Sequence, residues 1–168
     1  TCDAAAMPRR IAAAIRAALL DIGSLPDWNL SRVHLVGWAE GGAGVLQVVA
    51  QDERQPGLIS AAVFYPRCPK PAPWKSAVTL FLLTGEKDTT APAAACRAWA
   101  EKSEGPGPVV INRYVGVGHG FDVGEAGDTA YSAYQATGPK LIYDASTAAQ
   151  ALIDLVRFLK LNLATPAG

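Results

Sequence analysis

The sequence predicts an α/β fold in which a mostly parallel sheet carries helices on both faces, as a three-layer sandwich. Short apolar runs alternate along the chain with segments of helical periodicity, which is the order expected of a parallel sheet. The apolar runs are nearly continuous, as is typical of strands buried on both faces. With 168 residues, half of them hydrophobic, we expect a single domain over residues 1–168 with its own core.

The elements follow from these patterns in order. Strands are expected over residues 32–38, 58–66, 77–85 and 108–116. Helices are expected over residues 8–22, 41–52, 91–102 and 146–163. Pro8 suits the first turn of the first helix. The first helix should bury the stripe Ile11, Ile15, Ala18, Leu19 and Ile22, and the last helix the stripe Leu152, Ile153, Val156, Leu159 and Leu163.

Composition excludes several classes of protein. The net charge is zero, only 18% of residues are charged, and no basic run occurs, whereas nucleic-acid binding needs clustered Lys and Arg. No apolar stretch approaches the roughly 20 residues of a membrane-spanning helix. We therefore expect neither a nucleic acid nor a membrane as partner.

Three cysteines, Cys2, Cys68 and Cys96, fit no metal-binding spacing, and the odd count leaves at least one outside any internal disulfide. Cys68 follows one expected strand and Cys96 lies on the helix after the next strand, so the two could approach each other across a strand end. Two ordinary buried thiols are the alternative. A bond would favour a secreted or periplasmic protein, and free thiols would leave a cytoplasmic one open.

Two connecting segments depart from the alternation of strands and helices. Residues 67–75 are Pro-rich and are interpreted as a surface loop. Residues 120–143 are longer and contain Tyr131, Tyr134 and Tyr143. Because loops of that length are unusual inside a compact domain and are often functional, we interpret residues 120–143 as a candidate lid over a site.

The stretch "VGWAEGG" joins the first strand to the second helix and has the pattern of a nucleophile elbow without a nucleophile. Gly37 and Gly41 flank Ala39, and small neighbours allow the sharp turn on which such a nucleophile sits. The helix start would aim the backbone N–H of Glu40 at developing negative charge, as an oxyanion hole does. A strand–Gly–helix junction of ordinary packing is the alternative.

Two later residues fall where a hydrolase places its acid and base. Asp88 follows the third strand and His119 the fourth, which is the order nucleophile, acid, histidine. Asp88 would orient the ring and stabilise the imidazolium. Taken singly, Asp88 is also an ordinary turn residue and His119 a solvated one. His34, inside the first strand, is interpreted as a satisfied core or sheet histidine.

Together, "GWAEGG", "TGEKDTTAPAAACRAWAE", "GVGHGFD" and the closing helix resemble the dienelactone hydrolase family of the α/β-hydrolase fold, over about residues 9–163. The resemblance implies that Asp88 and His119 are the acid and base, and that Ala39 stands where the family has Cys or Ser. Trp38 and Phe121, beside these positions, are candidates for contact with the substrate. Such a hydrolase needs no cofactor.

The departures from the family are as informative as the matches. A methyl group at Ala39 cannot attack a carbonyl. The family normally has several strands and an oxyanion-hole loop before the first helix; without them the strand at 32–38 would have an unpaired edge. We therefore expect the chain to be the carboxy-terminal portion of such a domain, lacking the first strands, with a separate amino-terminal segment or a second copy covering that edge. Val123 stands where dienelactone hydrolases have a substrate-binding Arg, which leaves a broader class of small-molecule esters or lactones.

Three hypotheses follow. The first is an ester or lactone hydrolase that acts by nucleophilic acyl transfer and is inactive as written because Ala39 replaces its Ser or Cys. We favour the interpretation that this replacement is deliberate. The second is a natural non-catalytic protein of the same fold that binds a small ester, lactone or carboxylate. The third is a half-domain that pairs with another chain through its open sheet edge.

Overall fold

The computed structural model of the chain describes residues 6–27, 30–50, 57–69, 75–124, 141 and 143–164. Four strands form one sheet in the order β1-β2-β3-β4, and every neighbouring pair is parallel. Their bounds are β1 Val33–Trp38, β2 Leu58–Phe64, β3 Thr79–Gly85 and β4 Val109–Tyr114. The predicted fold class and all four predicted strands are confirmed.

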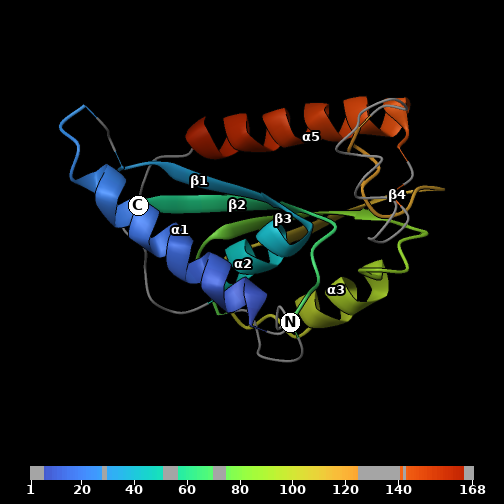
Figure 1. The fold of residues 1–168 in the computed structure, drawn as a ribbon, viewed down its shortest axis with the longest axis horizontal. Coiled ribbons are helices and arrows are strands. Elements are labelled where there is room, and N and C mark those ends of the chain that lie inside the picture. Colours follow the sequence, from blue (N-terminus) through green and yellow to red (C-terminus); the bar gives the residue numbers. More distant parts are fainter. Residues whose placement is uncertain are drawn as a thin grey trace.

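Helices cover both faces of this sheet. The bounds are α1 Met7–Gly23, α2 Ala39–Val49, α3 Ala93–Ala100 and α5 Ala145–Ala164. Figure 1 shows α5 on one face and α1, α2 and α3 on the other. α2 begins at Ala39, earlier than predicted, directly after Trp38, which keeps the extended backbone angles of β1.

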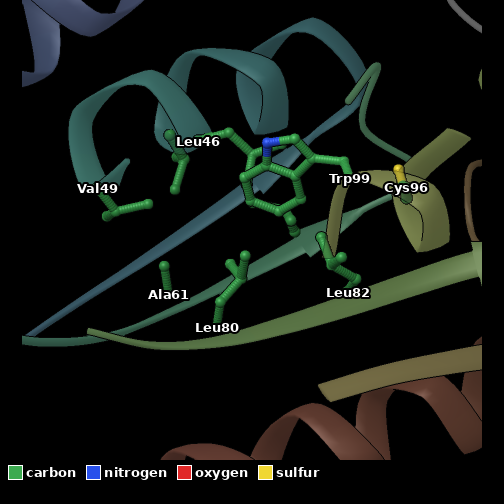
Figure 2. Close-up of a cluster of buried hydrophobic side chains, with 9 residues drawn as sticks. Leu46, Val49, Ala61, Leu80, Leu82, Cys96 and Trp99 are labelled. Carbon is green, nitrogen blue, oxygen red and sulfur yellow. The ribbon is translucent and has the colours of Figure 1, made fainter. Parts of the chain in front are cut away.

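The core lies on both sides of the sheet because successive strand residues point to opposite faces. Ala61, Val63, Leu80 and Leu82 pack against Leu46 and Val49 of α2 and Trp99 of α3. Figure 2 shows Ala61, Leu80 and Leu82 beneath the helix residues of this cluster. The alternate positions pack toward α5: Ala62, Phe64, Phe81 and Leu83, against Ala151 and Leu155.

The stripe predicted for α1 holds except at Ala18: Ile11, Ile15, Leu19 and Ile22 are partly buried. Ala12 is the fully buried residue of α1, Ile15 packs against the core, and Ala18 is exposed. α1 approaches α2 so closely at Gly44 that an added Cβ there would lie 2.3 Å from a methyl carbon of Ile11. Gly44 therefore allows α1 and α2 to pack closely.

The stripe predicted for α5 faces mostly outward. Its apolar residues occupy more than one face, so periodicity alone cannot tell which of them meets the sheet. Ala151 and Leu155 are buried, with Phe158 and Leu159 packed beside them. The outward residues line an open groove of about 620 Å³, which holds no nucleophile or acidic residue: Leu152, Ile153, Val156, Arg157, Lys160 and Leu161.

β1 is the end strand of the sheet and pairs only with β2 among the described residues, as expected for an open edge. Its first residues are half-buried instead of fully buried. Among the helices of the described residues, none is both long enough and apolar enough to cross a membrane.

Cys68 and Cys96, which were expected to approach each other across a strand end, are bonded. The disulfide Cys68–Cys96 joins the segment after β2 to α3. Arg67 to Pro69, the described start of the predicted surface loop, contain no helix or strand. Cys2, Tyr131 and Tyr134 lie outside the described residues, as does most of the candidate lid.

Candidate active site

The turn from β1 into α2 has the backbone of a strained elbow. Ala39 has φ +47°, a conformation that costs side-chain-bearing residues free energy and is uncommon outside glycine. A Cβ added to Gly37 would lie 2.9 Å from the backbone of Gly41 and Gly42, so the expected steric role of Gly37 is borne out by the packing. The same explanation is wrong for Gly41, because an added Cβ there would have nothing within 4 Å.

Asp88 and His119 lie in direct contact. The distance from His119 Nδ1 to Asp88 Oδ2 is 2.8 Å, and the two residues are only 6% and 4% exposed. The other carboxylate oxygen of Asp88 accepts hydrogen bonds from the backbone N–H groups of Thr90 and Ala91, each at 2.8 Å. With Nδ1 engaged by the carboxylate, Nε2 is the ring nitrogen left to act as a base.

Backbone contacts bring the loops that carry Asp88 and His119 together. The N–H of Lys87 donates to the carbonyl of Val117 at 2.8 Å, and the N–H of Glu86 donates to the carbonyl of Tyr114 at 2.9 Å. A Cβ on Gly85 would lie 2.6 Å from the carbonyl oxygen of Gly118. Gly85 is therefore what allows the loops after β3 and β4 to run side by side.

A small cavity of about 100 Å³ lies where the elbow and the histidine meet. Its lining is Ala39, Glu40, Tyr65, Arg67, Thr90, Ala91 and His119. The structure thus brings the three positions of the predicted triad to one place. Ala39 and His119 line the same cavity, and Asp88 is hydrogen-bonded to the Nδ1 of His119.

Glu40 and Arg67 form one wall of this cavity. Glu40 Oε1 lies 2.9 Å from the guanidinium of Arg67, whereas Glu40 Oε2 is buried and has no hydrogen-bond partner in the described part of the chain. The backbone N–H of Glu40 lies in the first turn of α2, where intrahelical acceptors are lacking. Sequence reasoning missed Arg67, because nothing distinguishes it from any other polar residue of a surface loop.

Neither of the two predicted substrate contacts, Trp38 and Phe121, is among the described residues that line the cavity. Trp38 is 42% exposed and stands beside the elbow, with its ring stacked on Phe64 at 5.1 Å. Phe121 is 0% exposed and packs among aromatic rings of the core. Phe121 thus contributes to packing in the core, and the contact of either residue with a substrate stays a prediction.

Two residues absent from the sequence prediction join this site. Tyr65 has φ +36° and its ring centroid lies 4.6 Å from that of His119. Asp122 accepts hydrogen bonds from Trp38 Nε1 and from the Tyr65 hydroxyl. The sequence offered one usable signal for Asp122, its position three residues after the candidate base.

The remaining candidates lie elsewhere. His34 Nδ1 is 2.6 Å from Ser60 Oγ, so one nitrogen of this sheet histidine is satisfied, but Nε2 is buried without a partner in the described residues. Burial, reinforced by the nearby charge of Arg32, lowers the pKa of His34. Val123 is on the surface, 38% exposed. The described residues contain no cluster of His, Cys, Asp and Glu suited to a metal ion.

A strained strand-to-helix turn, a carboxylate–histidine pair and a shared cavity on a parallel sheet define the class of α/β-hydrolase-fold proteins. The sequence profile of the Dienelactone hydrolase family matches residues 3–163. The chain therefore belongs to the dienelactone hydrolase family. No curated protein matches the chain.

Solved structures agree on the fold. A dienelactone hydrolase-like promiscuous phosphotriesterase from metagenomic libraries is similar with TM-score 0.69 and 19% identity, over 94% of this chain and 62% of that one. Esterase 2 of the Planctomycetes species Thermogutta terrifontis, with butyrate bound, is similar with TM-score 0.60 and 16% identity, over 96% of this chain and 67% of that one. This chain thus spans about 62% of the first relative's length. At these identities the likeness concerns the fold.

Proposed function

We propose that this chain is the scaffold of a hydrolase that cleaves carboxylic ester or lactone bonds by nucleophilic acyl transfer, and that Ala39 at the nucleophile position makes it inactive as it stands. The observation that carries the proposal is the φ of +47° at Ala39, in a residue that faces the same cavity as His119. The left-handed conformation costs an alanine roughly 1–2 kcal/mol. Strain of this kind is characteristic of functional sites.

The mechanism follows from the residues present once a hydroxyl or thiol stands at position 39. That group would attack the carbonyl carbon while His119 Nε2 accepts its proton, and Asp88 would stabilise the imidazolium. The N–H of Glu40 would donate to the oxyanion. The histidine would then return the proton to the departing alcohol oxygen, and a water molecule, activated in the same way, would release the acid. A methyl group at position 39 supports none of these steps.

The substrate we propose is a small ester or lactone. The cavity of about 100 Å³ suits a short acyl group. Support comes from the butyrate found in the Thermogutta esterase 2 structure and from another structure of that esterase phosphorylated by paraoxon.

The test is to install a nucleophile in the longest form of the chain that its gene encodes. Ala39→Ser and Ala39→Cys should hydrolyse p-nitrophenyl acetate and butyrate at least about 10³-fold faster than the protein with Ala39, because loss of a nucleophile typically costs that much or more. Paraoxon should phosphorylate the Ser variant once, as seen by intact mass. The matched control is Ala39→Ser with His119→Ala, which should lose both. Absence of turnover and of the adduct in both nucleophile variants would exclude the proposal.

A second candidate function is binding without catalysis. It is favoured by the fact that the buried Asp88–His119 pair and its cavity exist beside an alanine. It predicts saturable binding of a short ester, lactone or carboxylate to the protein with Ala39 in calorimetry, and no turnover after Ala39→Ser. Turnover in that variant would favour the hydrolase.

Two proposals concern the setting of the protein. The disulfide Cys68–Cys96 favours an oxidising compartment, which non-reducing mass spectrometry of protein from its native source would test. The open edge of β1 favours coverage by a preceding segment or by a second copy. A stable monomer of this chain in size-exclusion chromatography would exclude the second copy.

A further inference from the structure

The sheet places the elbow and the histidine at opposite edges. Ala39 follows β1 and His119 follows β4, with β2 and β3 between those strands. Strands lie about 4.8 Å apart, so the two strand ends are roughly 14 Å apart across the sheet. His119 shares a cavity with Ala39 only because the loop after β4 crosses over the ends of β3 and β2. The loop after β4 therefore needs contacts that fix its position over the strand ends.

Asp88 holds the loop over β3, and Asp122 holds it further along. Asp122 Oδ2 accepts a hydrogen bond from Trp38 Nε1 at 2.8 Å, and Asp122 Oδ1 accepts one from the Tyr65 hydroxyl at 2.7 Å. Trp38 is the last residue of β1 and the neighbour of Ala39, and Tyr65 directly follows β2. One carboxylate in the histidine loop thus bonds to residues at the ends of β1 and β2.

Tyr65 links Asp122 to His119, because it bonds Asp122 and its ring packs against the His119 ring. Its ring centroid lies 4.6 Å from that of His119, and its φ of +36° is unfavourable for an aromatic residue. Strained backbone persists only where the surroundings determine it by several contacts. The Tyr65 hydroxyl bond to Asp122 is one such contact, and the packing of the ring on Phe121 at 5.4 Å is another.

We infer that Asp122 is a positioning residue that fixes His119 over the nucleophile position by clamping Trp38 and Tyr65; this inference rests on the proposed function. Asp122 itself need not touch the substrate. Its loss should let the imidazole drift from the attacking atom, and a misplacement of about 1 Å can cost 10²-fold in rate. The clamp therefore affects the chemical step more than substrate binding.

Hydrogen-bond chemistry provides a conservative rescue. Asn at position 122 can accept from Trp38 Nε1 with its carbonyl oxygen and donate from its amide to the Tyr65 hydroxyl oxygen, which is also an acceptor. Ala at position 122 retains neither bond. A role in positioning therefore predicts that Asn substitutes for Asp, whereas a role that needs the negative charge predicts that it does not.

The first experiment measures hydrolysis of p-nitrophenyl butyrate in the Ala39→Ser background. We expect Asp122→Ala to lower kcat about 30- to 100-fold with KM changed less than threefold, in line with the cost of misplacing a catalytic group. Asp122→Asn should stay within about threefold of the parent. The kcat of Tyr65→Phe, which keeps the ring but removes the hydrogen bond to Asp122, should fall between those of the two Asp122 variants.

The matched control is Asp144→Asn, because the Asp144 side chain caps α5 instead of bonding Trp38 and Tyr65. The clamp would be refuted if kcat were unchanged in Asp122→Ala. It would also be refuted if kcat fell as far in Asp122→Asn as in Asp122→Ala.

The second experiment needs no activity and uses the protein with Ala39. The indole N–H resonance of Trp38 is identified by its loss in Trp38→Phe. Asp122→Ala should shift this resonance and broaden that of the His119 ring, whereas Asp144→Asn should move neither. If Ala39→Ser proves inactive but these shifts appear, the clamp stands and the proposed function fails. If Ala39→Ser is active and the His119 resonance is unchanged in Asp122→Ala, the function stands and the clamp is refuted.

Discussion

Gly37 and Gly41 touch across the elbow: a Cβ added to Gly37 would lie 2.9 Å from the carbonyl carbon and oxygen of Gly41. The neighbouring atoms are backbone and cannot rotate away. Gly37→Ala should therefore lower the free energy of unfolding by about 1–3 kcal/mol, the usual cost of overpacking. Urea denaturation followed by circular dichroism measures this change.

The matched control for Gly37→Ala is Gly41→Ala. An added Cβ at Gly41 has nothing within 4 Å, and the residue lies in α2. Because Ala is favoured over Gly in a helix by up to about 1 kcal/mol, Gly41→Ala should be neutral or stabilising. If both variants lose stability equally, the close approach at Gly37 is not what requires glycine there.

Asp88 gives a prediction about the tautomer of the base. In the Ala39→Ser background, Asp88→Asn keeps a carbonyl oxygen that can accept from Thr90 and Ala91. Its amide, however, donates toward His119 Nδ1, so the ring must place its proton on Nε2 and cannot act as a base. We expect kcat to fall about 10⁴-fold with little change in the unfolding midpoint. A loss below tenfold would show that Asp88 does not orient the histidine.

The strain at Ala39 can be measured directly. Ala39→Gly should change the free energy of unfolding by less than about 1 kcal/mol, because relief of the left-handed conformation offsets the extra entropy of glycine in the unfolded chain. Ala43→Gly, in the interior of the same helix, should lose about 1 kcal/mol or more, since no strain is relieved there. Equal losses at the two positions would mean that Ala39 is not strained.

The sequence allowed the strands, the helices and the places of Ala39, Asp88 and His119 to be predicted because each depends on local patterns: apolar runs, periodicity and glycines at a turn. The outward face of α5 was mistaken because Leu152 and Ile153 fit the helical period as well as Leu155 does, and only the position of the sheet decides between them. The contacts of Arg67 and Asp122 could not be predicted, because their partners Glu40, Trp38 and Tyr65 are distant in sequence.

The disulfide should supply much of the stability of the segment that carries Arg67. The two cysteines are separated by 28 positions, and closing a loop of that length in the unfolded chain corresponds to roughly 3–4 kcal/mol in the chain-entropy treatment. Comparison of oxidised and reduced protein by guanidinium denaturation measures the difference without changing any side chain. The variant with both Cys68 and Cys96 replaced by Ala should be insensitive to reductant. A difference under 1 kcal/mol would show that native-state contacts already hold the segment.

His34 should make stability depend on pH. Burial and the charge of Arg32 lower its pKa in the folded protein from the ordinary 6.5, so the unfolded chain binds a proton at this residue more readily. As pH falls through about 6.5, protonation therefore favours the unfolded state, and the contribution of neutral His34 to stability is lost. His34→Asn keeps a side chain able to bond Ser60 and removes the titration. Urea midpoints at pH 5 and pH 7 should thus differ less in His34→Asn than in the parent. An equal difference in the two proteins would assign the pH dependence to other groups.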